Sequence, residues 1–115
     1  MARPYVSHKK LCDNSRAAML AAIEVYNKPQ TTYREQVVTV LVVNAWELIL
    51  KAALRKSRKN IFYKKKRGED YRSFSLERCL ADMEAFHLWP DTVDGDGVRA
   101  NLHVLTDYRN KTIHL

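Results

Sequence analysis

The chain contains very little cysteine. Its two cysteines, Cys12 and Cys79, lie far apart among 115 residues and form neither a CxxC pair nor a Cys/His spacing typical of metal ligands. This pattern argues against a disulfide framework and against structural zinc. Because unpaired cysteines are typical of a reducing compartment, we expect a cytoplasmic protein.

Long uncharged apolar runs are lacking as well. The N-terminal segment MARPYVSHKKL has no apolar stretch of the kind that forms a signal peptide. The longest apolar segment, VVTVLVVNAWELILKAAL, is interrupted by Asn44, Glu47 and Lys51, whereas a membrane span needs about 20 mostly uncharged apolar residues. We therefore predict a buried helix and no membrane partner.

Acidic residues are missing between positions 55 and 67, where basic residues accumulate. Eight of them fall there: Arg55, Lys56, Arg58, Lys59, Lys64, Lys65, Lys66 and Arg67. The net charge is +7, so the other 102 residues, with 12 basic and 13 acidic groups, are nearly neutral. Phosphates attract such a segment, and bases stack on nearby aromatic rings such as Tyr63. This favours RNA binding through Lys64, Lys65, Lys66 and Arg67, with a merely solvated charge run as the alternative.

Hydrophobic periodicity predicts four helices in one domain with a single core. They cover about residues 9–26, 32–57 and 76–88, and the last begins near residue 98. Ser75 is the expected N-cap of the third helix. Between the second and third helices the helical period fails, and Gly68 can adopt a positive φ, so we expect a small β-hairpin or extended loop at residues 61–74.

The second predicted helix carries one polar stripe. Asn44, Glu47 and Lys51 share a helix face, and Glu47 precedes Lys51 by four residues, the favourable order for an ion pair. Two interpretations remain open: the pair orients the helix in the core, or Glu47 supports catalysis.

The tail YRNKTIHL places four residues between Arg109 and His114, with Asn110 directly after the arginine. The segment RPYVSH repeats the spacing near the start, but its proline prevents a rigid helical presentation there. In the last helix, a polar face contains His103, Asp107, Asn110 and His114. The expected core side is formed by Leu102, Leu105, Tyr108 and Thr112.

Several stretches in this order resemble the HEPN superfamily (higher eukaryotes and prokaryotes nucleotide-binding domains). The tail NLHVLTDYRNKTIH resembles its motif of an arginine, a polar residue, three further residues and a histidine. NAWELILKA and IFYKKKRGEDYRSFSLERCL resemble a bacterial branch of that superfamily whose members are domains of unknown function. The likeness runs from RAAMLAAIEVYNKP to the end of the chain.

The resemblance implies an all-α, up-and-down bundle of about four helices and metal-independent RNA cleavage in bacterial defence, toxin or stress systems. It assigns catalysis to Arg109, Asn110 and His114, with Glu47 as a supporting candidate, and it implies no cofactor and no metal. It also implies a homodimer, in which two motifs face one cleft, and an antitoxin or a further domain as a possible additional partner. Because a family helix continues beyond the histidine, we expect residues 1–115 to be a single domain truncated at its C-terminus.

The same residues allow independent chemistry. A histidine of ordinary pKa near 6.5 transfers protons near neutrality, and an arginine holds phosphate. The expected function is a metal-independent endoribonuclease acting on single-stranded RNA by 2′-hydroxyl attack. The alternative is a non-catalytic RNA-binding or protein-interaction module.

Overall fold

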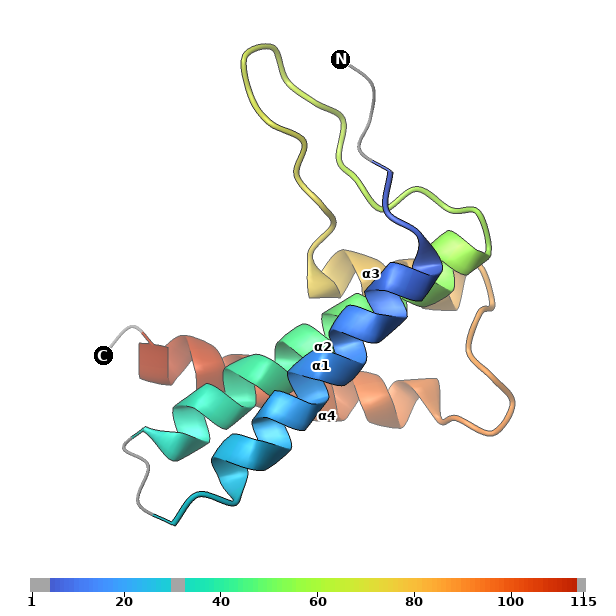
Figure 1. Ribbon diagram of the computed structural model, residues 1–115. Helices are drawn as coiled ribbons and strands as arrows, with labels where there is room; N and C mark the ends of the chain where they lie inside the picture. Colours follow the sequence, from blue (N-terminus) through green and yellow to red (C-terminus); the bar gives the residue numbers. More distant parts are fainter. Residues whose placement is uncertain (1–4, 30–32, 114–115) are drawn as a thin grey trace.

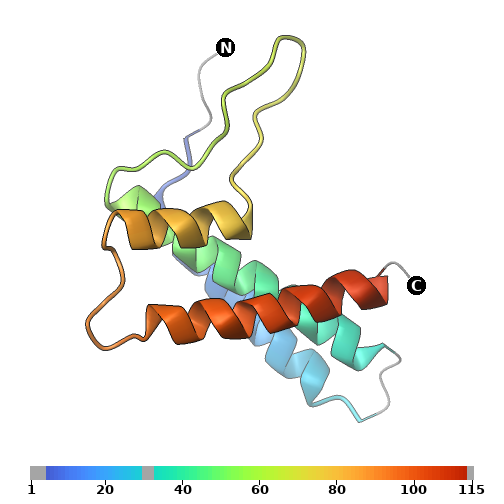
Figure 2. The same ribbon diagram turned by 180° about the vertical axis from the view of Figure 1, so that it is seen from behind.

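The computed structural model describes residues 5–29 and 33–113 and is built from helices (Figure 1). The four helices are α1 (His8–Tyr26), α2 (Arg34–Lys56), α3 (Leu76–Ala85) and α4 (Gly95–Ile113). An all-α bundle is thus confirmed. Helix α4 crosses α2 obliquely when the molecule is seen from behind (Figure 2), so α4 is not aligned with the α1/α2 pair.

Helices α1 and α2 form an antiparallel pair with small residues at their contact. Ser15, Ala18 and Ala22 lie on one stripe of α1 and are buried. The Ser15 hydroxyl donates a hydrogen bond of 2.7 Å to the Ala45 carbonyl of α2. Small side chains let the two backbones approach closely, and the hydroxyl bond fixes their register.

Helix α2 is the centre of the bundle, because the other three helices all pack against it. The largest fully buried side chains are Leu54, Ile61, Leu102, Val43 and Cys79. They come from α2, the following loop, α3 and α4, so one core joins all the elements on that side. By length and hydropathy α2 would also suit a membrane span. Its three helical neighbours and its buried Lys51 indicate the core helix of a bundle instead.

The segment between α2 and α3 is an extended loop that projects from the bundle (Figure 1). Its two arms share a single antiparallel bridge, Phe62 to Ser73, and no strand forms within residues 57–75. The β-hairpin prediction is therefore not supported. The apolar residues Ile61 and Phe74 anchor the base of the loop in the core, whereas most residues farther out are exposed.

Helix α3 ends three residues before the predicted Leu88. His87 adopts a left-handed φ of 52°, and the Leu88 amide donates to the Met83 carbonyl at 2.9 Å. This is a Schellman-type end in which a histidine occupies the position that usually holds glycine. Helix α3 ends here because the left-handed conformation of His87 is incompatible with a continued right-handed helix.

Helix α4 begins at Gly95, before the predicted start near residue 98. A Cβ atom at Gly95 would lie 2.8 Å from the Trp89 indole. Trp89 packs against the core. Glycine thus allows the first turn of α4 to lie directly on this ring.

Candidate active site and basic loop

The C-terminal half of α4 carries the arginine and asparagine of the proposed motif. Leu102 is buried and Leu105 partly buried, and Arg109 follows them at intervals of seven and four residues. Arg109 is likewise partly buried, so it continues the stripe of α4 that faces α2. Tyr108 is 39% exposed, so the prediction that it belongs to the core side was wrong. Arg109 takes that place.

Asn110 lies on the exposed side of α4. Asp107 lies one helical turn earlier and His103 two turns earlier; they are paired across 3.6 Å, and both are more than half exposed. The structure therefore gives α4 the polar face expected from the sequence. His114 and the side chain of Thr112 lie outside the described residues.

Glu47 is held in a polar contact on α2. Its carboxylate lies 3.7 Å from the Lys51 ammonium, which is nearly buried and donates a 2.9 Å hydrogen bond to the Ser73 hydroxyl. Burial raises the pKa of the neighbouring Cys79 thiol to about 11, although Lys51 opposes this shift. The contact joins α2 to the returning arm of the loop, which favours the structural interpretation of the Glu47 and Lys51 pair.

We define the basic loop as residues 57–75, and its base is ordered by hydrogen bonds. The Phe74 amide donates to the Ile61 carbonyl at 2.7 Å, and the Tyr63 amide donates to the Arg72 carbonyl at 2.8 Å. Asn60 brackets Phe62, accepting from its amide and donating to its carbonyl. These bonds fix the two arms relative to each other where they leave the bundle.

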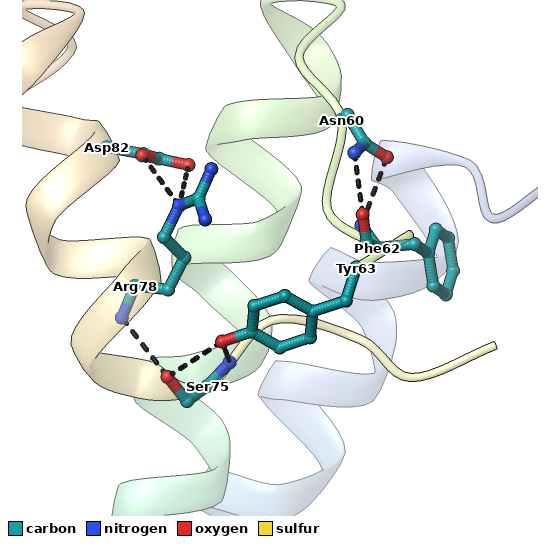
Figure 3. A network of polar contacts seen from close by, with 6 residues as sticks. All are labelled: Asn60, Phe62, Tyr63, Ser75, Arg78 and Asp82. Atoms are coloured by element: carbon teal, nitrogen blue, oxygen red, sulfur yellow. Dashed lines mark hydrogen bonds and ion pairs between the residues drawn. The ribbon is translucent and has the colours of Figure 1, made fainter. Parts of the chain in front are cut away.

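A second set of contacts ties the basic loop to the start of α3 (Figure 3). The Tyr63 hydroxyl lies 3.4 Å from both the amide and the hydroxyl of Ser75, and these hydrogen bonds lower the pKa of the phenol. Ser75 caps α3 as predicted, accepting from the Arg78 amide. Arg78 in turn lies over the Phe74 ring and pairs with Asp82. The base of the loop is thereby coupled to a helix terminus.

Farther out, the basic loop is exposed and highly charged. Lys64, Lys66 and Arg67 are exposed, and Lys65 is partly buried with its ammonium 5.7 Å from the centre of the Tyr71 ring. A hollow of about 530 Å³ lies between the arms. It is lined by Tyr63, Lys64, Lys66, Glu69, Asp70 and Arg72.

The structure separates the two groups of candidate residues. The basic loop leaves the end of α2, whereas the C-terminal half of α4 runs toward the side of the molecule where α2 begins (Figures 1 and 2). Lys64, Lys65, Lys66 and Arg67 are therefore brought together with one another, but not with Arg109 and Asn110 of the same chain.

Sequence reasoning missed that Glu69, Asp70 and Arg72 line the same hollow as Lys64 and Lys66. The available signal was the run KKKRGEDYR itself, in which a glycine turn folds acidic residues back toward basic ones. Within the described part of the chain, no group of three or more His, Cys, Asp or Glu side chains is arranged to hold a metal ion.

Comparison with known proteins identifies a family over most of the chain. No curated protein and no solved structure matches it. A family model described as "Domain of unknown function (DUF3644)" matches residues 10–115. Since this match covers nearly all of α1, the other three helices and the basic loop, the chain belongs to the DUF3644 family.

Proposed function

We propose that this chain is a HEPN-type endoribonuclease domain of a bacterial defence or toxin system, acting on single-stranded RNA. The observation that carries the proposal is the placement of the RNK segment on α4. The helix continues through Ile113, with Arg109 on the stripe facing α2 and Asn110 exposed. Such a helix presents a fixed charge beside a solvent-accessible polar face.

The reaction is an internal transfer of the phosphoryl group. The 2′-oxygen of a ribose loses its proton and bonds to the adjacent phosphorus, while the bond from phosphorus to the 5′-oxygen breaks and that oxygen gains a proton. The products are a 2′,3′-cyclic phosphate and a 5′-hydroxyl. His114 is the proposed proton carrier, because imidazole exchanges protons near neutral pH.

Arg109 is the proposed phosphate ligand. Its guanidinium stays charged and can bind two phosphate oxygens at once. Because the side chain is partly buried, its charge is less screened than that of a fully exposed arginine, so it stabilises negative charge on the phosphate oxygens more strongly. Asn110 is proposed to orient the phosphate or the histidine.

The active form is proposed to be a homodimer. Separate carriers for the two proton transfers would let base and acid act at the same time, and the motif offers one histidine per chain. On α4, Val104 is 67% exposed and Tyr108 39% exposed, and these apolar side chains lie next to the polar face. Light scattering should give twice the 13.4 kDa chain mass, and Val104→Glu should return the monomer. A monomeric parent protein at micromolar concentration would contradict the dimer.

The basic loop is proposed to bind the RNA backbone. Neutralising Lys64, Lys65, Lys66 and Arg67 should weaken binding about equally for all sequences, and it should flatten the salt dependence of the affinity. Unchanged affinity in this quadruple variant would move the binding surface elsewhere.

The decisive experiment measures cleavage of labelled single-stranded RNA with a chelator present. His114→Ala should slow cleavage by roughly 10² to 10⁴ while leaving RNA affinity nearly intact. Arg109→Ala should reduce cleavage and, to a smaller extent, affinity, because the phosphate is present in substrate and transition state alike. End-group analysis should find the 2′,3′-cyclic phosphate.

His103→Ala is the matched control, because His103 is an exposed histidine on the same helix. It should cleave like the parent protein, and circular dichroism should show that every variant is folded. If chelator abolishes cleavage, or if His114→Ala cleaves normally, the proposed mechanism is wrong. RNA binding without any cleavage would instead identify a non-catalytic RNA-binding module.

A further inference from the structure

The hollow within the basic loop is surrounded by charges of both signs that do not neutralise one another. Lys64, Lys66 and Arg72 contribute cations, and Glu69 and Asp70 contribute carboxylates. None of the ion pairs within 4.0 Å in the described part of the chain joins any two of these five groups. Oppositely charged side chains thus share one hollow while remaining available to a ligand.

The geometry of the loop explains how the charges are kept apart. The Tyr63 amide bonds the Arg72 carbonyl at the base, and the Glu69 amide bonds the Lys66 carbonyl at the tip. Gly68, with a φ of 81°, lies between Lys66 and Glu69 and reverses the direction of the chain at the tip. The arms are closed at both ends, so the side chains along them border an open space.

A ligand that fits this hollow must combine negative charge with hydrogen-bond donors. A nucleotide does so, because its phosphate suits lysine and arginine while its base can offer N–H groups to a carboxylate. Guanine presents two neighbouring donors, N1–H and the 2-amino group, on the edge that is free in a single strand. Adenine and uracil do not present this pair. The Tyr63 ring, 38% exposed, adds an aromatic surface at the same hollow.

We infer that the hollow of the basic loop is a guanine-selective nucleotide subsite. Glu69 and Asp70 accept hydrogen bonds from the base, and Lys64, Lys66 and Arg72 bind the flanking phosphates. The inference rests on the RNA-binding part of the proposed function and is independent of catalysis. The cations of the loop alone would bind any RNA sequence. The inference predicts that the loop as a whole also discriminates between bases.

The test uses the whole chain and labelled 2′-O-methyl oligouridine that contains one central guanosine, inosine, adenosine or uridine. The 2′-O-methyl group blocks attack by the 2′-oxygen, so fluorescence anisotropy reports binding alone. The oligonucleotide with guanosine should bind roughly five- to tenfold more tightly than those with uridine or adenosine. This is the lower part of the range for a bidentate base contact, because the site is open to solvent. Inosine, which lacks the 2-amino group, should lose much of this advantage.

The double variant Glu69→Gln, Asp70→Asn should lose the preference for guanosine while binding the all-uridine oligonucleotide at least as well as the parent protein. Asp13→Asn, Glu24→Gln is the matched control, because both residues are exposed carboxylates on α1, and it should keep the preference. Equal affinity for all four oligonucleotides, or guanosine preference that survives in the loop variant, would overturn the inference. Failure to bind any oligonucleotide would overturn it too. Cleavage without base preference would contradict the guanine subsite and support the ribonuclease proposal. Guanosine preference without cleavage would support the subsite and contradict the ribonuclease proposal.

Discussion

Replacement of Lys51 by methionine tests whether the Glu47 and Lys51 pair is structural. Lys51 is 6% exposed, and its ammonium bonds the Ser73 hydroxyl at 2.9 Å and faces Glu47 at 3.7 Å. Lys51→Met keeps the length and apolar stem of the side chain but removes its charge and both polar contacts.

The expected cost follows from those contacts. A hydrogen bond to a charged group contributes about 1.5 to 3 kcal/mol. The pair with Glu47 adds about 0.5 kcal/mol, a small term because the Glu47 side chain is 30% exposed. Removing a buried ammonium also recovers part of its desolvation cost. We therefore expect Lys51→Met to lower the free energy of unfolding by about 2 kcal/mol.

Urea denaturation followed by circular dichroism measures the effect, and a double-mutant cycle with Glu47→Gln isolates the pair. The double variant should be about 0.5 to 1 kcal/mol more stable than the sum of the single variants predicts, because neutral glutamine no longer leaves a carboxylate without its partner. Strict additivity, or a Lys51→Met variant as stable as the parent, would refute the structural interpretation. If Glu47→Gln retained stability but abolished RNA cleavage, Glu47 would instead support catalysis.

Two substitutions and one labelling experiment test the packing of the bundle. Gly95→Ala should lower the free energy of unfolding by about 1 to 2 kcal/mol, because the new Cβ must displace the Trp89 indole. This strain outweighs the gain in helix propensity of about 1 kcal/mol. Urea denaturation measures the loss, and an unchanged midpoint would contradict the close contact. His87→Gly should raise stability by about 0.5 to 1 kcal/mol, because glycine adopts the left-handed φ of 52° without strain; a lower thermal midpoint would contradict this account of the end of α3. At pH 8 a thiol reagent should modify the partly exposed Cys12 quickly and the buried Cys79 only after denaturation. The raised Cys79 pKa of about 11 favours the folded state fully below the ordinary pKa of 9, and this contribution is lost as the pH rises toward 11; rapid labelling of two thiols in the native protein would show that Cys79 is accessible.

The helices were predictable because their signals are local. The range of α1 and the N-cap at Ser75 depend only on patterns within a few residues, and the structure follows both. The ion pair on α2 was predictable for the same reason. The end of α3 was not, because a left-handed histidine at position 87 has no sequence signal comparable to glycine.

The loop shows why a break in helical period does not by itself predict strands. Paired strands need a ladder of hydrogen bonds and cross-strand side-chain contacts that stabilise it. Here the aromatic residues at the base provide one bridge, Phe62 to Ser73. Beyond this bridge the arms carry closely spaced lysines, and no strand forms within residues 57–75. An extended loop with an ordered base is the result.

Arg109 shows what could not be predicted about the candidate site from the sequence. Positions 108 and 109 both lie near the stripe set by Leu102 and Leu105, and hydrophobicity alone favours tyrosine as the inner residue. The oblique crossing of α4 over α2 (Figure 2) determines which one faces the bundle, and that crossing depends on packing between distant segments. Because Arg109 is partly buried on the inner stripe, we expect Arg109→Ala to affect both packing and phosphate binding. Arg109→Lys separates the two effects, because lysine keeps the charge and the aliphatic stem but cannot form the two-point contact with phosphate. If the proposed role is right, this variant keeps its stability and loses cleavage.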